Sequence, residues 1–209
     1  FSTLSPYPLK EVAIADDEIH AGSERFILYD SVISGSLYFD KTIIPDWFWF
    51  DSDTAFLRKR SEIYKAWNDS IAGFSITETG KVKNVDFLVF TPGQPLVKKV
   101  KLVLNGNELY ELFNHLSPQD IKGLYDKIFD EFKVTKESDR HIPVQSQATA
   151  LTTLLQQADT QTVNKLKLWW NDLAFSKADI PALQKLLLKI YPDFDSSYTN
   201  SNLNKKVVD

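Results

Sequence analysis

Four aromatic residues follow one another inside the segment PDWFWFD at positions 45–51. In a β-strand, successive side chains point to opposite faces, so Trp47 and Trp49 would leave one face while Phe48 and Phe50 leave the other. Such a strand is either covered on both faces or exposes two indoles on one of them. The run therefore predicts either a strand sandwiched between two layers or a binding surface built on Trp47 and Trp49.

The composition excludes several classes of function. The 209-residue chain is 43% apolar and 13% aromatic, which is typical of a folded globular protein. A net charge of -4 argues against nonspecific nucleic-acid binding, which needs a basic surface. The absence of cysteine excludes disulfides, thiolate nucleophiles and Cys-based metal sites. No apolar run approaches the ~20 residues of a membrane-spanning helix, so we expect no transmembrane segment.

The first half of the chain has the pattern of a sheet with one helix. Residues alternate most clearly over 33–39, and a cap at Ser52 or Asp53 predicts a helix to about Trp67. A turn containing proline and glycine at 91–95 separates two of the later strands. The predicted strands lie within 25–39 and at 43–50, 71–77, 82–90 and 96–104.

The second half has helical periodicity, and Asn105-Gly106 is taken as the end of the β region. The predicted helices lie at 109–116, 118–132, 145–158, 162–175 and 178–190. The fold class expected is therefore α+β: a mainly antiparallel sheet in the N-terminal half, with one helix, followed by an all-helical C-terminal half of about five helices. We expect a β-rich region at 1–106, a helical region at 107–193 that packs on the sheet or stands beside it, and a flexible tail at 194–209. The connector at 133–143 is the expected hinge if there are two bodies.

No pattern in the sequence predicts catalysis. His20, His115 and His141 lie far apart in different contexts, and no nucleophile, phosphate-binding or metal-binding motif is present. We therefore predict no catalytic residue, no metal ligand and no cofactor. One enzymatic alternative stays open, in which carboxylates of the sheet region converge as in glycoside hydrolases. The candidates are Asp30, Asp46, Asp51 and Asp86.

The candidate binding residues surround the aromatic run. Trp47 and Trp49 are amphipathic anchors of the kind enriched at binding hot spots, with Asp46 and Asp51 beside them as hydrogen-bond acceptors. The basic residues Arg58 and Lys59 follow at the start of the first predicted helix. Together these six residues form the predicted binding site.

The function predicted from these observations is that of a non-enzymatic binding or adaptor protein acting through protein–protein contacts. The alternatives are a carboxylate-based hydrolase and a carbohydrate-binding module that stacks a sugar on Trp47 and Trp49. The chain begins at Phe1 and contains no methionine, which suggests a processed protein, exported or at the bacterial cell surface. Nothing in the sequence indicates an oligomeric state.

Overall fold

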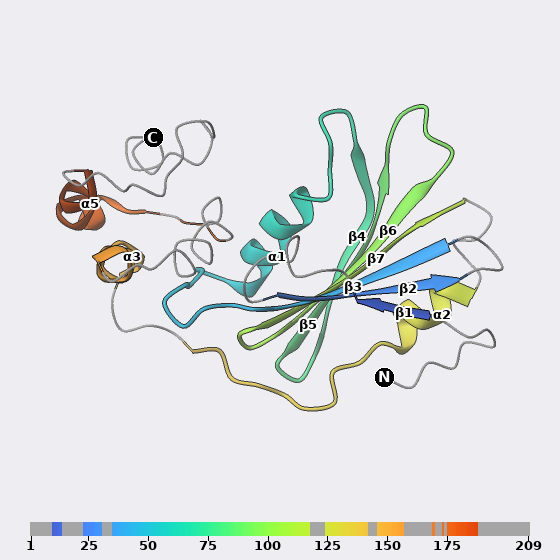
Figure 1. Ribbon diagram of the computed structural model, residues 1–209, viewed down its shortest axis with the longest axis horizontal. Helices are drawn as coiled ribbons and strands as arrows, with labels where there is room; N and C mark the ends of the chain where they lie inside the picture. The colour runs from blue at the N-terminus through green and yellow to red at the C-terminus, as the bar shows by residue number, and fades with distance from the viewer. Residues whose placement is uncertain are drawn as a thin grey trace. The chain divides into compact units, whose positions relative to one another are not determined.

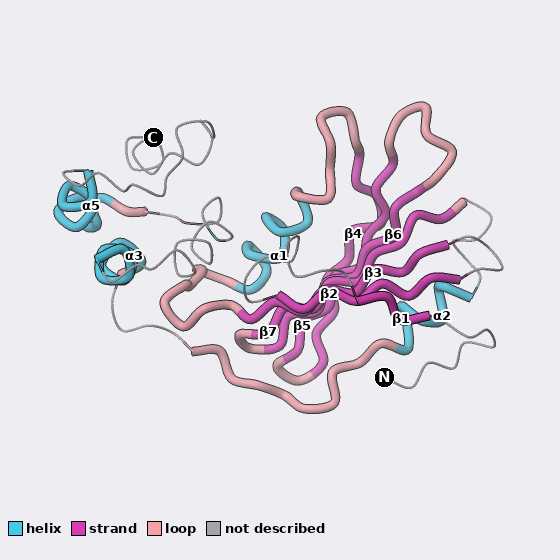
Figure 2. The backbone as a smooth tube through the Cα atoms, in the orientation of Figure 1, coloured by secondary structure: helices cyan, strands magenta, loops and turns pink. Residues whose placement is uncertain are grey.

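The computed structural model describes residues 10–13, 23–30, 35–117, 124–141, 146–156, 169, 173 and 175–187. These residues belong to two compact units. The larger unit contains the sheet and the chain from Phe50 to His141 (Figures 1 and 2). The smaller unit takes in Pro45–Trp49 and the described residues from Ser146 onward.

The larger unit is built on a seven-stranded sheet in which every neighbouring pair of strands is antiparallel. The spatial order is β1-β2-β3-β7-β6-β5-β4, so β1 and β4 are the edges. The strands are β1 (Lys10–Ala13), β2 (Ser23–Asp30), β3 (Gly35–Ile43), β4 (Ser70–Thr79), β5 (Val82–Phe90), β6 (Val97–Asn105) and β7 (Glu108–Leu116).

The described helices are short. Two belong to the larger unit, α1 (Asp53–Glu62) and α2 (Leu124–Glu131), and two to the smaller unit, α3 (Gln147–Gln156) and α5 (Ile180–Leu187), which follows the 3-10 helix η3 (Lys177–Asp179). The Ser52 hydroxyl caps α1 by accepting the backbone N–H of Ala55 at 3.1 Å, as the sequence predicts.

The expected all-helical C-terminal half is wrong, because residues 108–116 form β7 at the centre of the sheet. Its two faces carry buried residues alternately, with Leu109 and Glu111 on one and Leu112 and Leu116 on the other. A strand covered on both faces has no polar alternation, and its apolar spacing then resembles that of a helix. Gly106 and Asn107, before it, form the two-residue hairpin turn that joins β6 to β7.

Other parts of the expected helical half have mixed outcomes. The predicted helices at 145–158 and 178–190 correspond to α3 and to η3 with α5. Within the predicted helix at 118–132, residues 118–123 lie outside the described residues, and α2 occupies Leu124–Glu131. The predicted helix at 162–175 and the tail at 194–209 lie outside the described residues, apart from positions 169, 173 and 175.

The predicted strand at 43–50 is also wrong. β3 ends at Ile43, which pairs with Glu108, the first residue of β7. Beyond it the chain turns, and Phe48 donates its backbone N–H to the carbonyl of Pro45 at 2.9 Å. Pro45 has no N–H with which to extend the ladder, so the strand ends before it.

Each face of the sheet carries a helix. On the first face, α1 buries Phe56 and Leu57 among the inward residues of the central strands, including Val85 and Leu102. On the opposite face, α2 contributes Phe129 to a cluster with Leu37, Phe39, Leu112 and Leu116. This two-sided cover makes β3, β6 and β7 the core of the larger unit.

A buried carboxylate fixes α1 on its face. Glu111 of β7 is 2% exposed and accepts two hydrogen bonds from Arg60 of α1, from Nε at 2.9 Å and from Nη2 at 2.8 Å. The Tyr64 hydroxyl donates to the same carboxylate at 3.0 Å. Burial and the negative charge of Glu111 raise the pKa of Tyr64 well above its ordinary value, so the phenol remains a donor. A two-point contact of this kind fixes both the position and the rotation of the helix.

On the other face, the segment 132–141 crosses the ends of two hairpins, and we call it the strap. Asn105 binds the strap backbone on both sides, donating from Nδ2 to the Lys136 carbonyl at 3.0 Å and accepting the Ser138 N–H at 2.8 Å. The Asn107 side chain accepts the N–H of His141 at 3.1 Å. Up to His141, the connector expected to be a hinge is therefore hydrogen-bonded to the sheet.

The smaller unit joins an early segment to late helices. The buried Phe48 packs on Trp169 with ring centroids 4.9 Å apart, and Gln147 donates from Nε2 to the Trp49 carbonyl at 2.6 Å. Between the helices, the Thr152 hydroxyl of α3 reaches the Ala182 carbonyl of α5 at 3.5 Å.

The Glu111 contact predicts the behaviour of a charge-removing variant. We expect Glu111→Gln to lower the free energy of unfolding by about 2 kcal/mol, because Arg60 would stay largely buried without a counter-charge. Urea denaturation measures the change. The control Glu62→Gln removes an exposed partner of Lys65 and should change stability by less than about 0.5 kcal/mol. Equal effects of the two variants would contradict the assigned role of Glu111.

The strap predicts a difference between two glycines. Gly106 has φ +60°, and a Cβ there would lie 2.8 Å from the carbonyl oxygens of Ser138 and Asp139. Gly73 has φ +66°, and a Cβ at that position would have no other atom within 4 Å. Gly73→Ala should therefore show only the backbone strain, about 1 kcal/mol, and Gly106→Ala at least about 1 kcal/mol more. Thermal or urea unfolding of both variants checks this, and a Gly73→Ala loss as large as that of Gly106→Ala would contradict it.

Candidate interaction surface

The six predicted binding residues are divided between the two units. Asp46, Trp47 and Trp49 belong to the smaller unit, and Asp51, Arg58 and Lys59 to the larger one.

In the smaller unit, the two indoles do not lie on one face of a strand. Trp47 and Trp49 are both half-buried, and Asp46 is exposed. Trp47 meets the ring of Phe48 edge to face, with centroids 6.0 Å apart and planes at 86°. Phe48 is the buried member of the run, at 2% exposure. The premise of alternating faces fails here because the segment forms a turn.

In the larger unit, the structure places Arg58 and Lys59 at a cleft of about 360 Å³, which we call the α1–β4 cleft. Both side chains are exposed because Phe56, Leu57 and Ser61 form the buried side of α1. The guanidinium of Arg58 lies 4.9 Å from the ring centroid of Phe74, a cation–π contact. The cleft is lined by Arg58, Lys59, Ser61 and Glu62 of α1 and by Ile71 and Phe74 of β4. Asp51, also exposed, does not line it.

The β4 side of this cleft is an edge of the sheet (Figure 1). The pairing of β4 with β5 is interrupted between Ala72 and Ser75, where Gly73 takes φ +66°. This is a β-bulge, which bends an edge strand and re-aims a side chain. Phe74, at the bulge, packs against Phe87 with ring centroids 6.0 Å apart.

A second group of exposed apolar residues lies at one end of the same sheet. Helix α1 was expected to continue to about Trp67, but it ends at Glu62. Trp67 is 98% exposed, Ile63 57% and Leu96 46%. Figure 2 shows that the loops joining α1 to β4 and β5 to β6 extend beyond the same end of the sheet. We call this surface the Trp67 end; its residues are Ile63, Trp67, Phe90 and Leu96.

The turn that carries Trp67 is closed by hydrogen bonds in both directions. The Asp69 N–H donates to the Ala66 carbonyl at 3.1 Å, and the Ala66 N–H donates to the Asp69 carboxylate at 2.8 Å. Hydrogen bonds from the Ala66 N–H and from the Thr91 side chain lower the pKa of Asp69. The contact with Thr91 joins this turn to the β5–β6 loop. Trp67 is thus fully exposed on an ordered backbone.

The sequence did contain a signal for this site. Asn68-Asp69-Ser70 follows Trp67, and these residue types are typical of turns. A turn placed there moves Trp67 out of the helical stripe and onto a loop tip.

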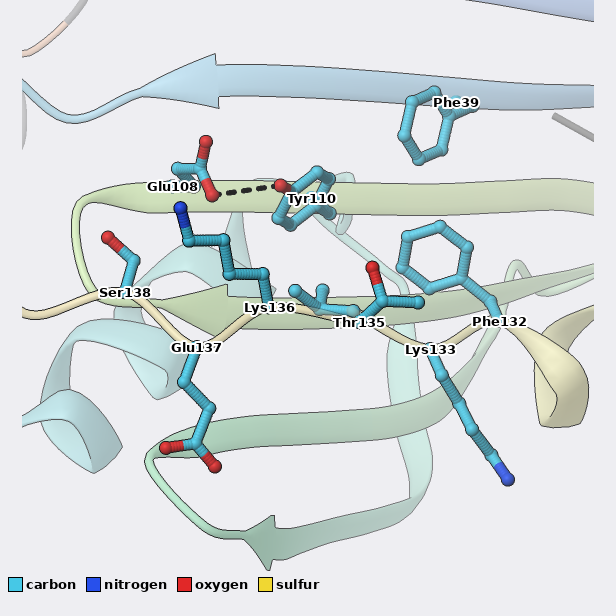
Figure 3. A pocket seen from close by; sticks show the side chains of 10 residues that line it. Phe39, Glu108, Tyr110, Phe132, Lys133, Thr135, Lys136, Glu137 and Ser138 are labelled. Carbon is cyan, nitrogen blue, oxygen red and sulfur yellow. Dashed lines mark hydrogen bonds between the residues drawn. The ribbon is translucent and has the colours of Figure 1, made fainter.

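The cleft beside the strap, about 450 Å³, has a different character (Figure 3). Its aromatic side chains are Phe39, Tyr110 and Phe132, and its carboxylates are Glu108 and Glu137. Glu108 accepts hydrogen bonds from the Tyr110 hydroxyl at 3.0 Å and from Asn105 at 3.2 Å, and lies 3.2 Å from the Lys41 ammonium. These partners are all supplied by the protein, so Glu108 acts here as a structural acceptor.

Glu108 predicts a contribution of this cleft to acid stability. Burial alone would raise its pKa, but the hydrogen bonds from Tyr110, Lys41 and Asn105 and the charge of Lys41 together lower it. A lowered folded-state pKa stabilises the protein above the unfolded value of about 4.3 and the effect is lost as the pH falls through the folded value. We therefore expect the stability difference between the protein and Glu108→Gln to be constant above pH about 5 and to shrink below about 4. Urea midpoints across this range measure it, with the exposed Glu131→Gln controlling for loss of one negative charge. A difference that grows on acidification would contradict the assignment.

Within the described parts of the chain, no helix is long and apolar enough to cross a membrane. The same residues contain no group of three or more His, Asp or Glu side chains placed to hold a metal ion.

No protein-family model matches the chain, and no curated protein matches it. Among solved structures, it is similar to the solution structure of cyanobacterial PsbP (CyanoP) from Synechocystis. The identity is 11% and the TM-score 0.43, over 59% of this chain and 79% of that one. This likeness is too distant to transfer a fold or a function. The α+β architecture is therefore established by the helices and strands of this structure alone. The chain contains no cysteine.

Proposed function

We propose that this protein is a non-enzymatic binding protein that holds a protein partner at the Trp67 end. The observation that carries the proposal is the 98% exposure of Trp67 on a turn closed by two hydrogen bonds. An exposed indole at the same end of the sheet as the exposed Ile63, Phe90 and Leu96 leaves apolar area in water, which a partner would remove.

The order of the turn favours binding over incidental exposure. A mobile loop loses backbone conformational entropy when it is bound, whereas a hydrogen-bonded turn has less backbone entropy to lose. Tryptophan is also among the residues most enriched at binding hot spots, since it buries a large area with few rotatable bonds.

The charges near the Trp67 end indicate the chemistry of the partner. Lys98 donates from Nζ to the Tyr64 carbonyl at 3.2 Å, which places an ammonium beside the turn. Farther along α1, Arg58 and Lys59 are exposed. The partner surface that complements these groups has an apolar pocket for the indole and acidic residues around it.

A cross-linking experiment tests the proposal. A photoreactive amino acid at position 67 should capture a protein in cells that express this chain naturally, and the same group at Thr79, exposed at the other end of β4, should not. With the captured protein purified, Trp67→Ala should weaken binding about thirtyfold or more, as expected for a hot spot. Titration calorimetry measures the affinity.

The controls separate a lost contact from a damaged fold. Trp67 is almost fully exposed, so Trp67→Ala should change the free energy of unfolding by no more than about 0.5 kcal/mol. Trp47→Ala should leave the affinity unchanged within about twofold. Capture and loss of affinity at position 47, with none at 67, would move the binding site to the smaller unit and overturn the proposal.

A further inference from the structure

We infer that the partner presents an extended acidic segment, which adds as a strand to the outer edge of β4 and inserts apolar side chains into the α1–β4 cleft. This inference rests on the proposed function and names the kind of segment that would occupy the surface next to Trp67. It is carried by the position of β4, the lining of the cleft and the charges at its rim.

The edge of β4 is open within the described part of the chain. β4 is the last strand in the sheet order, and β5 is the one described strand that pairs with it. The outward backbone N–H and C=O groups of an edge strand bind an added strand through main-chain hydrogen bonds, whatever its sequence. β4 begins at Ser70, three residues after Trp67, so the edge starts where the Trp67 turn ends.

The cleft lies alongside this edge and has an apolar floor. Ile71 and Phe74 are both half-buried and both line it. In an added strand every second side chain points to the same face, so alternate apolar residues would enter the cleft. The main chain would then supply affinity and the cleft would supply selectivity.

The rim of the cleft selects acidic segments. Arg58 and Lys59 are exposed there, and the third charged residue, Glu62, lies 2.6 Å from the Lys65 ammonium. A carboxylate in the added strand would therefore meet the Arg58 guanidinium, which is suited to paired hydrogen bonds. If a second copy of this chain bound here through its own β4 edge, the basic rims of the two copies would face each other, which is unfavourable.

The bulge at Gly73 limits how the edge can be used. It divides β4 into two short runs, Ser70–Ala72 and Ser75–Thr79, and so prevents continuous pairing along the strand. Short edges of this kind protect a sheet from open-ended aggregation. The same bulge places Phe74 under the Arg58 guanidinium, at the point where apolar floor and cationic rim meet.

Synthetic peptides test the inference directly. The probe, called the valine–glutamate peptide, is fluorescein-labelled and about eight residues long, a length typical of a strand. Serine occupies every second position, and valine and glutamate take turns at the positions between, so that both face the cleft. Three comparison peptides should bind more weakly or not at all: valine–lysine, serine–glutamate, and the valine–glutamate peptide N-methylated on every second backbone nitrogen. N-methylation on the edge-facing side should weaken binding about thirtyfold, because it removes main-chain hydrogen bonds and leaves charge and side chains intact. Methylation in the opposite register should have a much smaller effect.

A matched pair of variants locates the site. Arg58→Glu/Lys59→Glu should weaken binding of the valine–glutamate peptide about tenfold or more, by replacing attraction with repulsion. Lys133→Glu/Lys136→Glu makes the same charge change on the exposed strap and should have little effect. In ¹⁵N-edited NMR, the amides shifted by the peptide should be those of β4.

Three results would overturn the inference: no binding of the valine–glutamate peptide at 1 mM or below, equal binding in both methylation registers, or displacement of the peptide by self-association through β4. None of them affects the cross-linking result at position 67. Capture at position 67 without peptide binding would leave the proposed function standing and refute the added strand. Peptide binding without capture at position 67 would support the added strand and refute the proposed function.

Discussion

The contact between Glu111 and α1 determines where the exposed features of this protein lie. The Glu111 carboxylate is held by Arg60, in the last turn of α1, and by Tyr64, which lies four positions later, just beyond the helix. Because Arg60 binds through two nitrogens, the helix can neither rotate nor slide without breaking the pair. The rotation directs Arg58 and Lys59 away from the core, and the position fixes where the chain leaves α1 for Trp67. A single buried charge thus orients both the cleft and the turn.

The β4 edge, the α1–β4 cleft and the Trp67 indole would each contribute a different part of the proposed binding. An edge strand binds backbone without selectivity, a cleft gives selectivity without much affinity, and an exposed tryptophan gives affinity over a small area. On this chain the three are contiguous along α1 and β4. The opposite face carries α2 and the strap, and Glu108 there is hydrogen-bonded by Tyr110 and Asn105 and lies 3.2 Å from the Lys41 ammonium. The proposed binding surfaces of the larger unit therefore lie along α1 and β4.

Where the local pattern decided the structure, the sequence predicted it well. β5 has the predicted bounds, Val82–Phe90, and the turn after it closes with a hydrogen bond from Gln94 N–H to the Thr91 carbonyl and with Gly93 at φ +78°. Proline and glycine at fixed offsets define such a turn without tertiary help. The sequence analysis named Arg58 and Lys59, which line the α1–β4 cleft, and did not name Trp67 or the β4 edge.

The failures share a tertiary cause. Glu108–Leu116 is covered on both faces, and its buried Glu111 is paired by Arg60 of α1, 51 positions away. The strand before the aromatic run ends at Ile43, where its partner β7 begins at Glu108, 65 positions along the chain, and where Pro45 offers no N–H to extend it. Strand order and edges are also tertiary facts, since they depend on which hairpins meet. Periodicity reports how many faces are buried, and it does not say what buries them.

The aromatic run has a consequence for the order in which the two units can fold during synthesis. Phe48 and Trp49 find their partners, Trp169 and Gln147, only after 98 or more further residues have been added. At synthesis rates of about 5–20 residues per second, the segment waits roughly 5–20 s before these partners emerge. During that interval the later strands of the sheet are synthesised, while Phe48 and Trp49 still lack these partners. The smaller unit can therefore fold only after the larger one has been synthesised. Until then, the nascent chain carries the aromatic run without its late partners.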